Sequence, residues 1–215
     1  SQLKQNAQHH QVATLCTYIE HLPEFISQNS VKLATVINFP QGTDKLDVSL
    51  AAIEKAAHLG ASEIDYVLPY AMYLEGQTQQ TLSRYRTVFQ LCKQHKLVLK
   101  IILETGVFPN QQTIYTVSRE LIALGADFIK TSTGKIPLGA SLSAVFAILS
   151  AIKDANTTSG IKISGGIKKP QQAFCYATLA ELIMGKPIDK SWFRIGASSL
   201  LGEQIGRASC RERVS

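Results

Sequence analysis

A lysine at the end of an apolar strand is the first residue whose surroundings suggest chemistry. The stretch Asp127–Lys135 reads DFIKTSTGK, with Lys130 directly after Phe128-Ile129 and before three hydroxyl residues and a glycine. Burial disfavours the ammonium form of a lysine, so a neutral amine becomes available near neutral pH. A neutral amine can attack a carbonyl and form a Schiff base. The alternative is a strand-end lysine whose amine reaches water, and Lys130 alone does not decide between the two.

Four further charged residues recur at the spacing of one strand–helix unit. Asp65, Lys100, Lys162 and Arg194 lie with Lys130 on five successive predicted strands, 30 to 35 residues apart. In a closed barrel such residues converge on one mouth, whereas an open sheet spreads them along an edge. Lys100 and Arg194 are equally well explained as ordinary rim charges. Asp65 is flanked by apolar residues, and a buried carboxylate needs a partner.

Two glycine-bearing loops follow the last two predicted strands. One is Ser164-Gly165-Gly166, and the other is Gly196-Ala197-Ser198-Ser199, which is expected to open a helix. Loops at these positions, together with a helix N-terminus, form the usual phosphate site of an α/β barrel. Dinucleotide-binding and Walker patterns are absent from the sequence, which argues against dinucleotides and nucleoside triphosphates.

The elements that must position these residues alternate between short apolar runs and amphipathic helices. This alternation predicts a parallel sheet covered by helices, either an open doubly wound sheet or a closed barrel. Asp44, Asn110 and Ser141 are predicted helix caps, and Pro170 the first turn of a helix with Phe174 on its core side. The predicted strands are Val12–Tyr18, Leu33–Ile37, Glu63–Leu68, Leu97–Leu103, Asp127–Lys130, Gly160–Ser164 and Phe193–Ile195.

Composition excludes several classes of protein. The 215 residues suit one large domain, no apolar run is long enough to span a membrane, and no signal peptide is visible. The four cysteines lie far apart, which favours reduced thiols over disulfides or a zinc site. The net charge of +6 suits an anionic small substrate. The scattered lysines do not indicate nucleic-acid binding.

At these residues the chain resembles deoxyribose-phosphate aldolase, a class I aldolase family with a (β/α)8 TIM-barrel fold. The resemblance runs from about Val12 to Leu201. The matching segments are ATVINFPQG, EIDYVLPY, LKIILETG, DFIKTSTGK, IKISGGI and RIGASSLL, in the order of the family.

The resemblance implies a role for each matching residue. Lys130 is expected to be the Schiff-base lysine, Lys162 the second lysine that depresses its pKa, and Asp65 the proton-relay carboxylate. Lys100 and Cys16 are secondary candidates. The residues expected to bind the substrate or its phosphate are Thr131, Gly134, Gly165, Gly166, Gly196, Ser198 and Ser199.

The implied reaction is the reversible cleavage of 2-deoxy-D-ribose 5-phosphate into D-glyceraldehyde 3-phosphate and acetaldehyde. The iminium acts as the electron sink, so no metal or cofactor is expected. The resemblance implies deoxyribonucleoside catabolism in the cytoplasm, without nucleic-acid or membrane partners, and it allows a homodimer.

The sequence also departs from the family pattern. Seven strands are predicted where the family barrel has eight, so we expect a single barrel domain over residues 1–201 that lacks its first strand. Residues 202–215 read as a foreign or frame-shifted tail. The alternatives are therefore an inactive remnant of such a barrel, or another Schiff-base aldolase of sugar phosphates.

Overall fold

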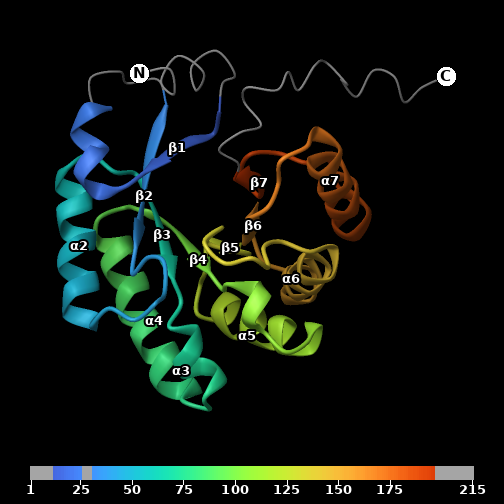
Figure 1. Cartoon of the computed structure of the whole chain (residues 1–215), viewed down its shortest axis with the longest axis horizontal. Helices are drawn as coiled ribbons and strands as arrows, with labels where there is room; N and C mark the ends of the chain where they lie inside the picture. Colours follow the sequence, from blue (N-terminus) through green and yellow to red (C-terminus); the bar gives the residue numbers. More distant parts are fainter. Residues whose placement is uncertain (1–11, 26–30, 197–215) are drawn as a thin grey trace.

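A computed structural model of the chain describes residues 12–25 and 31–196. Within these ranges the chain alternates between strands and helices (Figure 1). The strands are β1 Thr14–Thr17, β2 Lys32–Ile37, β3 Glu63–Val67, β4 Val98–Ile102, β5 Phe128–Lys130, β6 Gly160–Ser164 and β7 Phe193–Gly196. The helices are α2 Leu46–His58, α3 Tyr70–Leu74, α4 Thr78–Gln94, α5 Gln111–Ala123, α6 Leu142–Ala155 and α7 Pro170–Met184, with short 3-10 turns at Ile19–Glu24 (η1) and Thr105–Val107 (η2).

The strands form one parallel sheet in sequence order, from β1 to β7. Figure 1 shows the helices on the outer side of this curved sheet. The predicted α/β class and parallel sheet are confirmed, and all seven predicted strands are present within the described residues. No membrane-crossing helix occurs among those residues, since none is both long and apolar enough. The predicted tail, residues 202–215, lies outside the described residues.

Side-chain contacts show how strongly the sheet curves. Neighbouring strands lie about 4.8 Å apart, so β3 and β6 would be about 14 Å apart in a flat sheet. Nevertheless Lys162 Nζ on β6 lies 2.6 Å from Asp65 Oδ2 on β3. Arg194 on β7 reaches both Glu63 on β3 and Thr14 on β1. The sheet therefore curls until its two end strands are linked by side chains, as a barrel wall requires.

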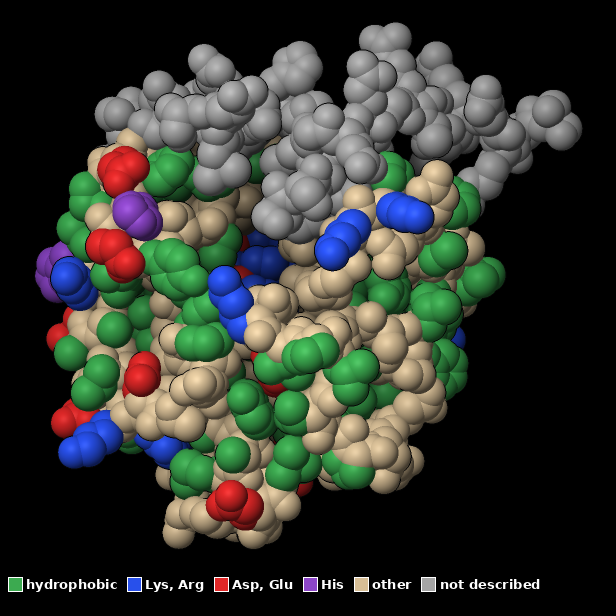
Figure 2. All heavy atoms as spheres, in the orientation of Figure 1, with side chains coloured by type: hydrophobic (Ala, Val, Ile, Leu, Met, Phe, Trp, Pro, Cys, Tyr) green, Lys and Arg blue, Asp and Glu red, His purple; other side chains and the backbone are tan. Residues whose placement is uncertain are grey.

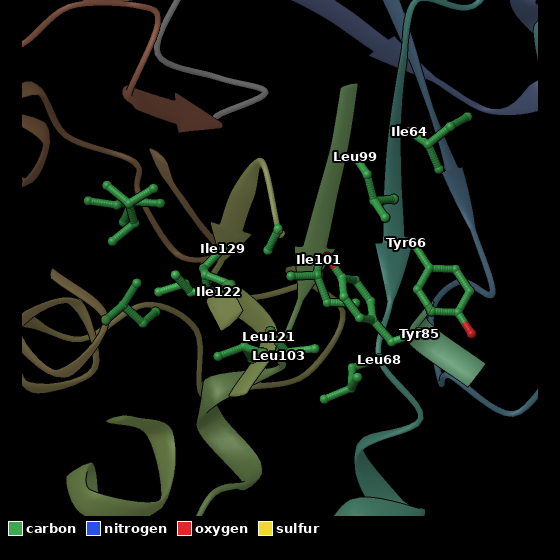
Figure 3. Packing of buried hydrophobic residues seen from close by; sticks show 14 of the residues in the cluster. Ile64, Tyr66, Leu68, Tyr85, Leu99, Ile101, Leu103, Leu121, Ile122 and Ile129 are labelled. Carbon is green, nitrogen blue, oxygen red and sulfur yellow. The ribbon is translucent and has the colours of Figure 1, made fainter. Parts of the chain in front are cut away.

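The two-residue period of the strands sorts apolar and charged side chains onto opposite faces. Ile64 and Tyr66 of β3 are fully buried in the hydrophobic core, as are Leu99 and Ile101 of β4 and Ile129 of β5 (Figure 3). The residues that alternate with them along the strands point to the concave face, and three of these are Asp65, Lys100 and Lys130. An apolar layer under the helices thus fixes the direction in which the charged side chains project.

Helix ends follow local capping rules at some positions and not at others. Asn110 and Ser141 cap α5 and α6, accepting from the N–H groups of Thr113 and Ala144 as predicted. The predicted cap at Asp44 is wrong: α2 begins after Lys45, and the backbone N–H of Asp44 donates to Asn38 Oδ1. The predicted core position of Phe174 is also wrong, because its side chain is 49% exposed.

Candidate active site

Asp65 is the centre of a buried cluster of charges on the concave face. Its side chain is completely buried. Lys100 Nζ donates to Oδ1 at 2.9 Å, whereas Lys130 Nζ and Lys162 Nζ both donate to Oδ2 at 2.6 Å. Neighbouring strands β3, β4, β5 and β6 each contribute one of the four side chains. The sequence spacing therefore brings together the residues that it predicted to converge.

The cluster contains a second layer that the sequence did not reveal. Glu63 Oε2 accepts from Lys100 Nζ at 2.5 Å and from Arg194 Nη1 at 2.7 Å, and its side chain is fully buried. Arg194 Nη1 also donates to Thr14 Oγ1 at 3.1 Å. Glu63 lies two residues before Asp65, so the two-residue period was a usable signal that both carboxylates share a face.

The balance of charges sets the protonation of the lysines. Four cationic side chains share two buried carboxylates in this cluster. Lys100 contacts both carboxylates, but Lys130 and Lys162 compete for a single oxygen of Asp65. A buried excess of positive charge is costly, and losing one proton relieves it.

The individual pKa values respond to burial and to charge in different proportions. Burial lowers the pKa of Lys130 and Lys162 adds to the effect, so the pKa of Lys130 falls although Asp65 opposes the change. For Lys162 burial also lowers the pKa and is the largest single effect, but Asp65, Cys16 and Glu63 together outweigh it and the pKa is raised. Burial would raise the pKa of Asp65, yet the three lysines hold it well below its usual range. Lys130 is thus the lysine best able to present a neutral amine.

The segment after Lys130 is held against the loop after β6. The hydroxyl of Thr131 donates to the carbonyl of Ser164 and accepts from its N–H, both at 2.9 Å. A Cβ added to Gly134 would meet Gly165 Cα at 3.7 Å. Gly165 itself has φ +92°, and a Cβ there would lie 2.9 Å from Ser132 Cβ, so only glycine fits. The segment that carries Thr131 and Gly134 therefore meets the predicted phosphate-binding loop Ser164-Gly165-Gly166 beside the lysine.

The other predicted glycines serve different purposes. Gly166 has φ +80° and open space where its Cβ would be, which leaves its backbone accessible. At Gly196 a Cβ would lie 3.2 Å from Lys162 Cε, so its absence leaves room for that side chain. Ser198 and Ser199, also predicted to bind phosphate, lie outside the described residues.

The secondary candidates also lie in the cluster. Lys100 is fully buried between the two carboxylates. Cys16 is exposed, and its Sγ contacts Asp65 Oδ2 at 4.0 Å. In Figure 2 basic and acidic side chains are visible recessed in a hollow of the face shown. Among the described residues, no three or more His, Cys, Asp or Glu side chains gather as they would around a metal ion.

Glu104 was overlooked by the sequence analysis although it lies in the quoted segment LKIILETG. It is fully buried just after β4, and its carboxylate accepts from the N–H of Thr133 at 3.3 Å and from the Thr133 hydroxyl. An acidic residue directly after a buried strand was a signal of the same kind as Lys130, at the same end of the sheet.

Comparisons with known proteins agree with this arrangement. The sequence matches the DeoC/LacD family aldolase over residues 4–211. Among solved structures, the aldolase QR15 is 28% identical with a TM-score of 0.74, covering 91% of this chain and 81% of QR15. A candidate deoxyribose-phosphate aldolase from Coccidioides immitis is 27% identical with a TM-score of 0.76, covering 91% of this chain and 73% of the other.

A third similar structure is the deoxyribose phosphate aldolase from Aeropyrum pernix, which is described as a tetramer. It is 27% identical with a TM-score of 0.69, covering 86% of this chain and 73% of the other. The family match spans most of the sequence, and the curled parallel sheet is common to these structures. This chain belongs to the DeoC/LacD family of aldolases.

Proposed function

We propose that the chain is a class I aldolase that forms a Schiff base through Lys130 and reversibly cleaves 2-deoxy-D-ribose 5-phosphate. The products are D-glyceraldehyde 3-phosphate and acetaldehyde. The observation that carries the proposal is the shared contact of Lys130 Nζ and Lys162 Nζ with one oxygen of the buried Asp65. It provides an amine with a lowered pKa beside a second ammonium and a carboxylate.

The first steps use the neutral amine of Lys130. It attacks the C1 aldehyde of the open-chain sugar and forms a carbinolamine, whose hydroxyl leaves as water to give an iminium ion. Asp65 Oδ2 accepts from the amines of both Lys130 and Lys162, so Asp65 and Lys162 can hold and return the protons of these steps.

The carbon–carbon bond then breaks between C2 and C3. The C3 hydroxyl loses its proton, glyceraldehyde 3-phosphate departs, and the electron pair of the broken bond passes into the iminium to give an enamine. Protonation at C2 restores an iminium, and water releases acetaldehyde and the free amine. Asp65 remains anionic while ammonium groups surround it, so it becomes a proton acceptor only when Lys130 has lost its charge.

The phosphate is assigned to the glycine-bearing loops. Gly134 and Gly165 lie beside each other, and Gly166 has an accessible backbone in a left-handed conformation. Successive N–H groups in such turns form concave anion-binding sites. We infer that Ser198 and Ser199 complete this site, and that the seven strands are those of a (β/α)8 barrel.

Product analysis tests the proposal. Incubation with 2-deoxy-D-ribose 5-phosphate should release acetaldehyde and glyceraldehyde 3-phosphate in equal amounts, and Lys130→Arg should abolish the release because arginine stays protonated. Lys93→Arg is a matched control, because Lys93 pairs with Asp127 away from the charge cluster. This variant should retain full activity. Cleavage of a different sugar phosphate alone would support another Schiff-base aldolase, and no cleavage of any sugar phosphate would support an inactive remnant.

A further inference from the structure

The segment that carries Glu104 is fastened to the segment that carries the proposed nucleophile. The N–H of Leu103 donates to the carbonyl of Lys130 at 3.0 Å, and the N–H of Thr105 donates to the carbonyl of Thr131 at 2.9 Å. Glu104 lies between these two hydrogen bonds. The pairing of β4 with β5 therefore continues past the strand ends and fixes the place of Glu104 relative to Lys130.

The backbone of Glu104 adopts a conformation that non-glycine residues rarely accept. Its φ of 61° and ψ of 59° are left-handed, and such strain is kept where the surrounding structure enforces it, often at functional sites. Here it accompanies a fully buried carboxylate whose two oxygens both accept from Thr133. The Thr133 hydroxyl in turn accepts from the N–H of Lys135 at 3.1 Å. One side chain thus orders the loop that follows the nucleophile.

The carboxylate also interacts with the charge of Lys130. Burial raises the pKa of Glu104, while its bonds to Thr133 and the charge of Lys130 oppose the change. Burial and the charge of Glu104 also raise the pKa of Tyr70 at the start of α3. Glu104 therefore lies within electrostatic reach of the Lys130 amine.

We propose that Glu104 is a positioning residue for the nucleophile: it fixes Thr133 and the loop 131–135 beside Lys130, and its carboxylate supplies a second negative charge to the lysine. The inference rests on the proposed imine at Lys130. Glu104 does not contact the amine in the way that Asp65 does, so its effect is on the orientation of the loop and on the charge of the lysine.

Other charged or titratable groups face Lys130 from three strands. Asp65 on β3 accepts from Lys130 and from Lys162 on β6, and Cys16 on β1 contacts Asp65. Asp65 and Cys16 favour the ammonium form of Lys130, and Lys162 disfavours it. These groups are the same in every Glu104 variant, so a change in the protonation of Lys130 reports the charge at position 104.

The test measures reductive trapping of acetaldehyde on Lys130 as a function of pH in the full chain. Glu104→Gln retains groups that can bond to Thr133 but removes the charge, so the ammonium of Lys130 loses a stabilising partner. The acidic limb of the profile should move to lower pH. At a pH on that limb, the rate of trapping divided by the plateau rate should be higher than in the wild type by roughly twofold or more. Glu104→Asp should retain the wild-type limb, because it keeps the charge.

Two further variants separate charge from loop order. Thr133→Val removes the hydroxyl but leaves the carboxylate, so it should lower the plateau of trapping without moving the limb. Glu120→Gln is the matched control, since Glu120 is also a carboxylate that accepts from a hydroxyl, that of Tyr73 at 2.7 Å. It should change neither limb nor plateau.

The outcomes distinguish this inference from the proposed function. Trapping on Lys130 with the same pH profile in the wild type and in Glu104→Gln would overturn the inference and leave the proposed function standing. A limb displaced equally by Glu120→Gln would overturn it as well. Absence of a Lys130 adduct in the folded wild-type chain would overturn the proposed function, and the inference with it.

Discussion

Replacing Asp65 with asparagine should destabilise the protein to an extent that depends on pH. The substitution keeps the size of the side chain but removes the charge that contacts three lysine amines at 2.6 to 2.9 Å. Lys100 keeps Glu63 as a partner. Lys130 and Lys162 are left without a carboxylate contact among the described residues, in an interior where they are only 6% and 8% exposed.

Removing one partner of a buried ion pair typically costs about 3–5 kcal/mol, because an uncompensated charge remains in the interior. For a chain of this size, 1 kcal/mol corresponds to about 2–4 °C in melting temperature, so Asp65→Asn should melt about 6–20 °C below the wild type at pH 7. The loss is a large fraction of a typical total stability of about 5–15 kcal/mol.

The sign of the pH dependence follows from the lysines. In the variant, the buried lysines have a pKa lower than the value of about 10.4 in the unfolded chain, so the unfolded state binds more protons. Stability of the variant therefore rises as the pH approaches about 10. In the wild type the pKa of Lys162 is raised, so its stabilising contribution is present throughout this range and is lost only above about pH 10.4. The deficit in melting temperature should thus shrink from pH 7 to pH 10.

Thermal unfolding followed by circular dichroism at several pH values measures this effect. Asp154→Asn serves as a control, because Asp154 also accepts a hydrogen bond, from the Tyr115 hydroxyl, but on the surface. It should change the melting temperature by only a few degrees at any pH. If Asp65→Asn melted within the same few degrees as the wild type at pH 7, or if its deficit were constant with pH, the buried charge cluster would not exist as described.

Three further outcomes are expected. Lys162→Met removes an ammonium that lowers the pKa of Lys130, so trapping of acetaldehyde should need a higher pH and be slower at pH 7 by about tenfold or more; an unchanged pH profile would contradict the role of the second lysine. Gly166→Glu should raise KM for the phosphorylated sugar much more than for unphosphorylated deoxyribose, whereas Gly185→Glu, also at a left-handed glycine with open space around it, should affect neither; equal losses for both sugars in Gly166→Glu would show that this loop supports the fold instead. Hydrogen exchange should be faster in β1 and β7, which are paired on one side only among the described residues, than in β3 to β5; equal protection would contradict the edge position of β1 and β7.

The sequence predicted the strands and the cluster because both depend on local pattern. Short apolar runs between amphipathic helices define a buried parallel sheet without reference to distant contacts. A charged residue inside such a run, as at Asp65 or Lys130, needs a partner of opposite charge. The spacing of one strand–helix unit indicates that the partners are the charged residues on the neighbouring strands. The same rule predicted where Lys162 lies, whereas for Lys100 it left an ordinary rim charge as an equal alternative.

Other features could not be predicted because they depend on contacts between distant segments. Glu63 is paired with Arg194, which lies four strands away, and this contact exists only because the sheet curls. Glu104 is buried because Thr133 approaches it from the next loop. The cap predicted at Asp44 failed on a local contact instead: its N–H donates to Asn38 Oδ1, and α2 begins after Lys45. Phe174 satisfies a helical apolar pattern yet remains half exposed on α7.

Identification of the lysine that forms the imine is the most direct test of the proposed chemistry. The folded chain is incubated with acetaldehyde, the adduct is reduced with borohydride, and the modified residue is located by peptide mass spectrometry. A single ethyl group on Lys130, absent from Lys130→Arg, is the predicted result. Modification of Lys162 or Lys100 with Lys130 untouched would contradict the assignment of the nucleophile.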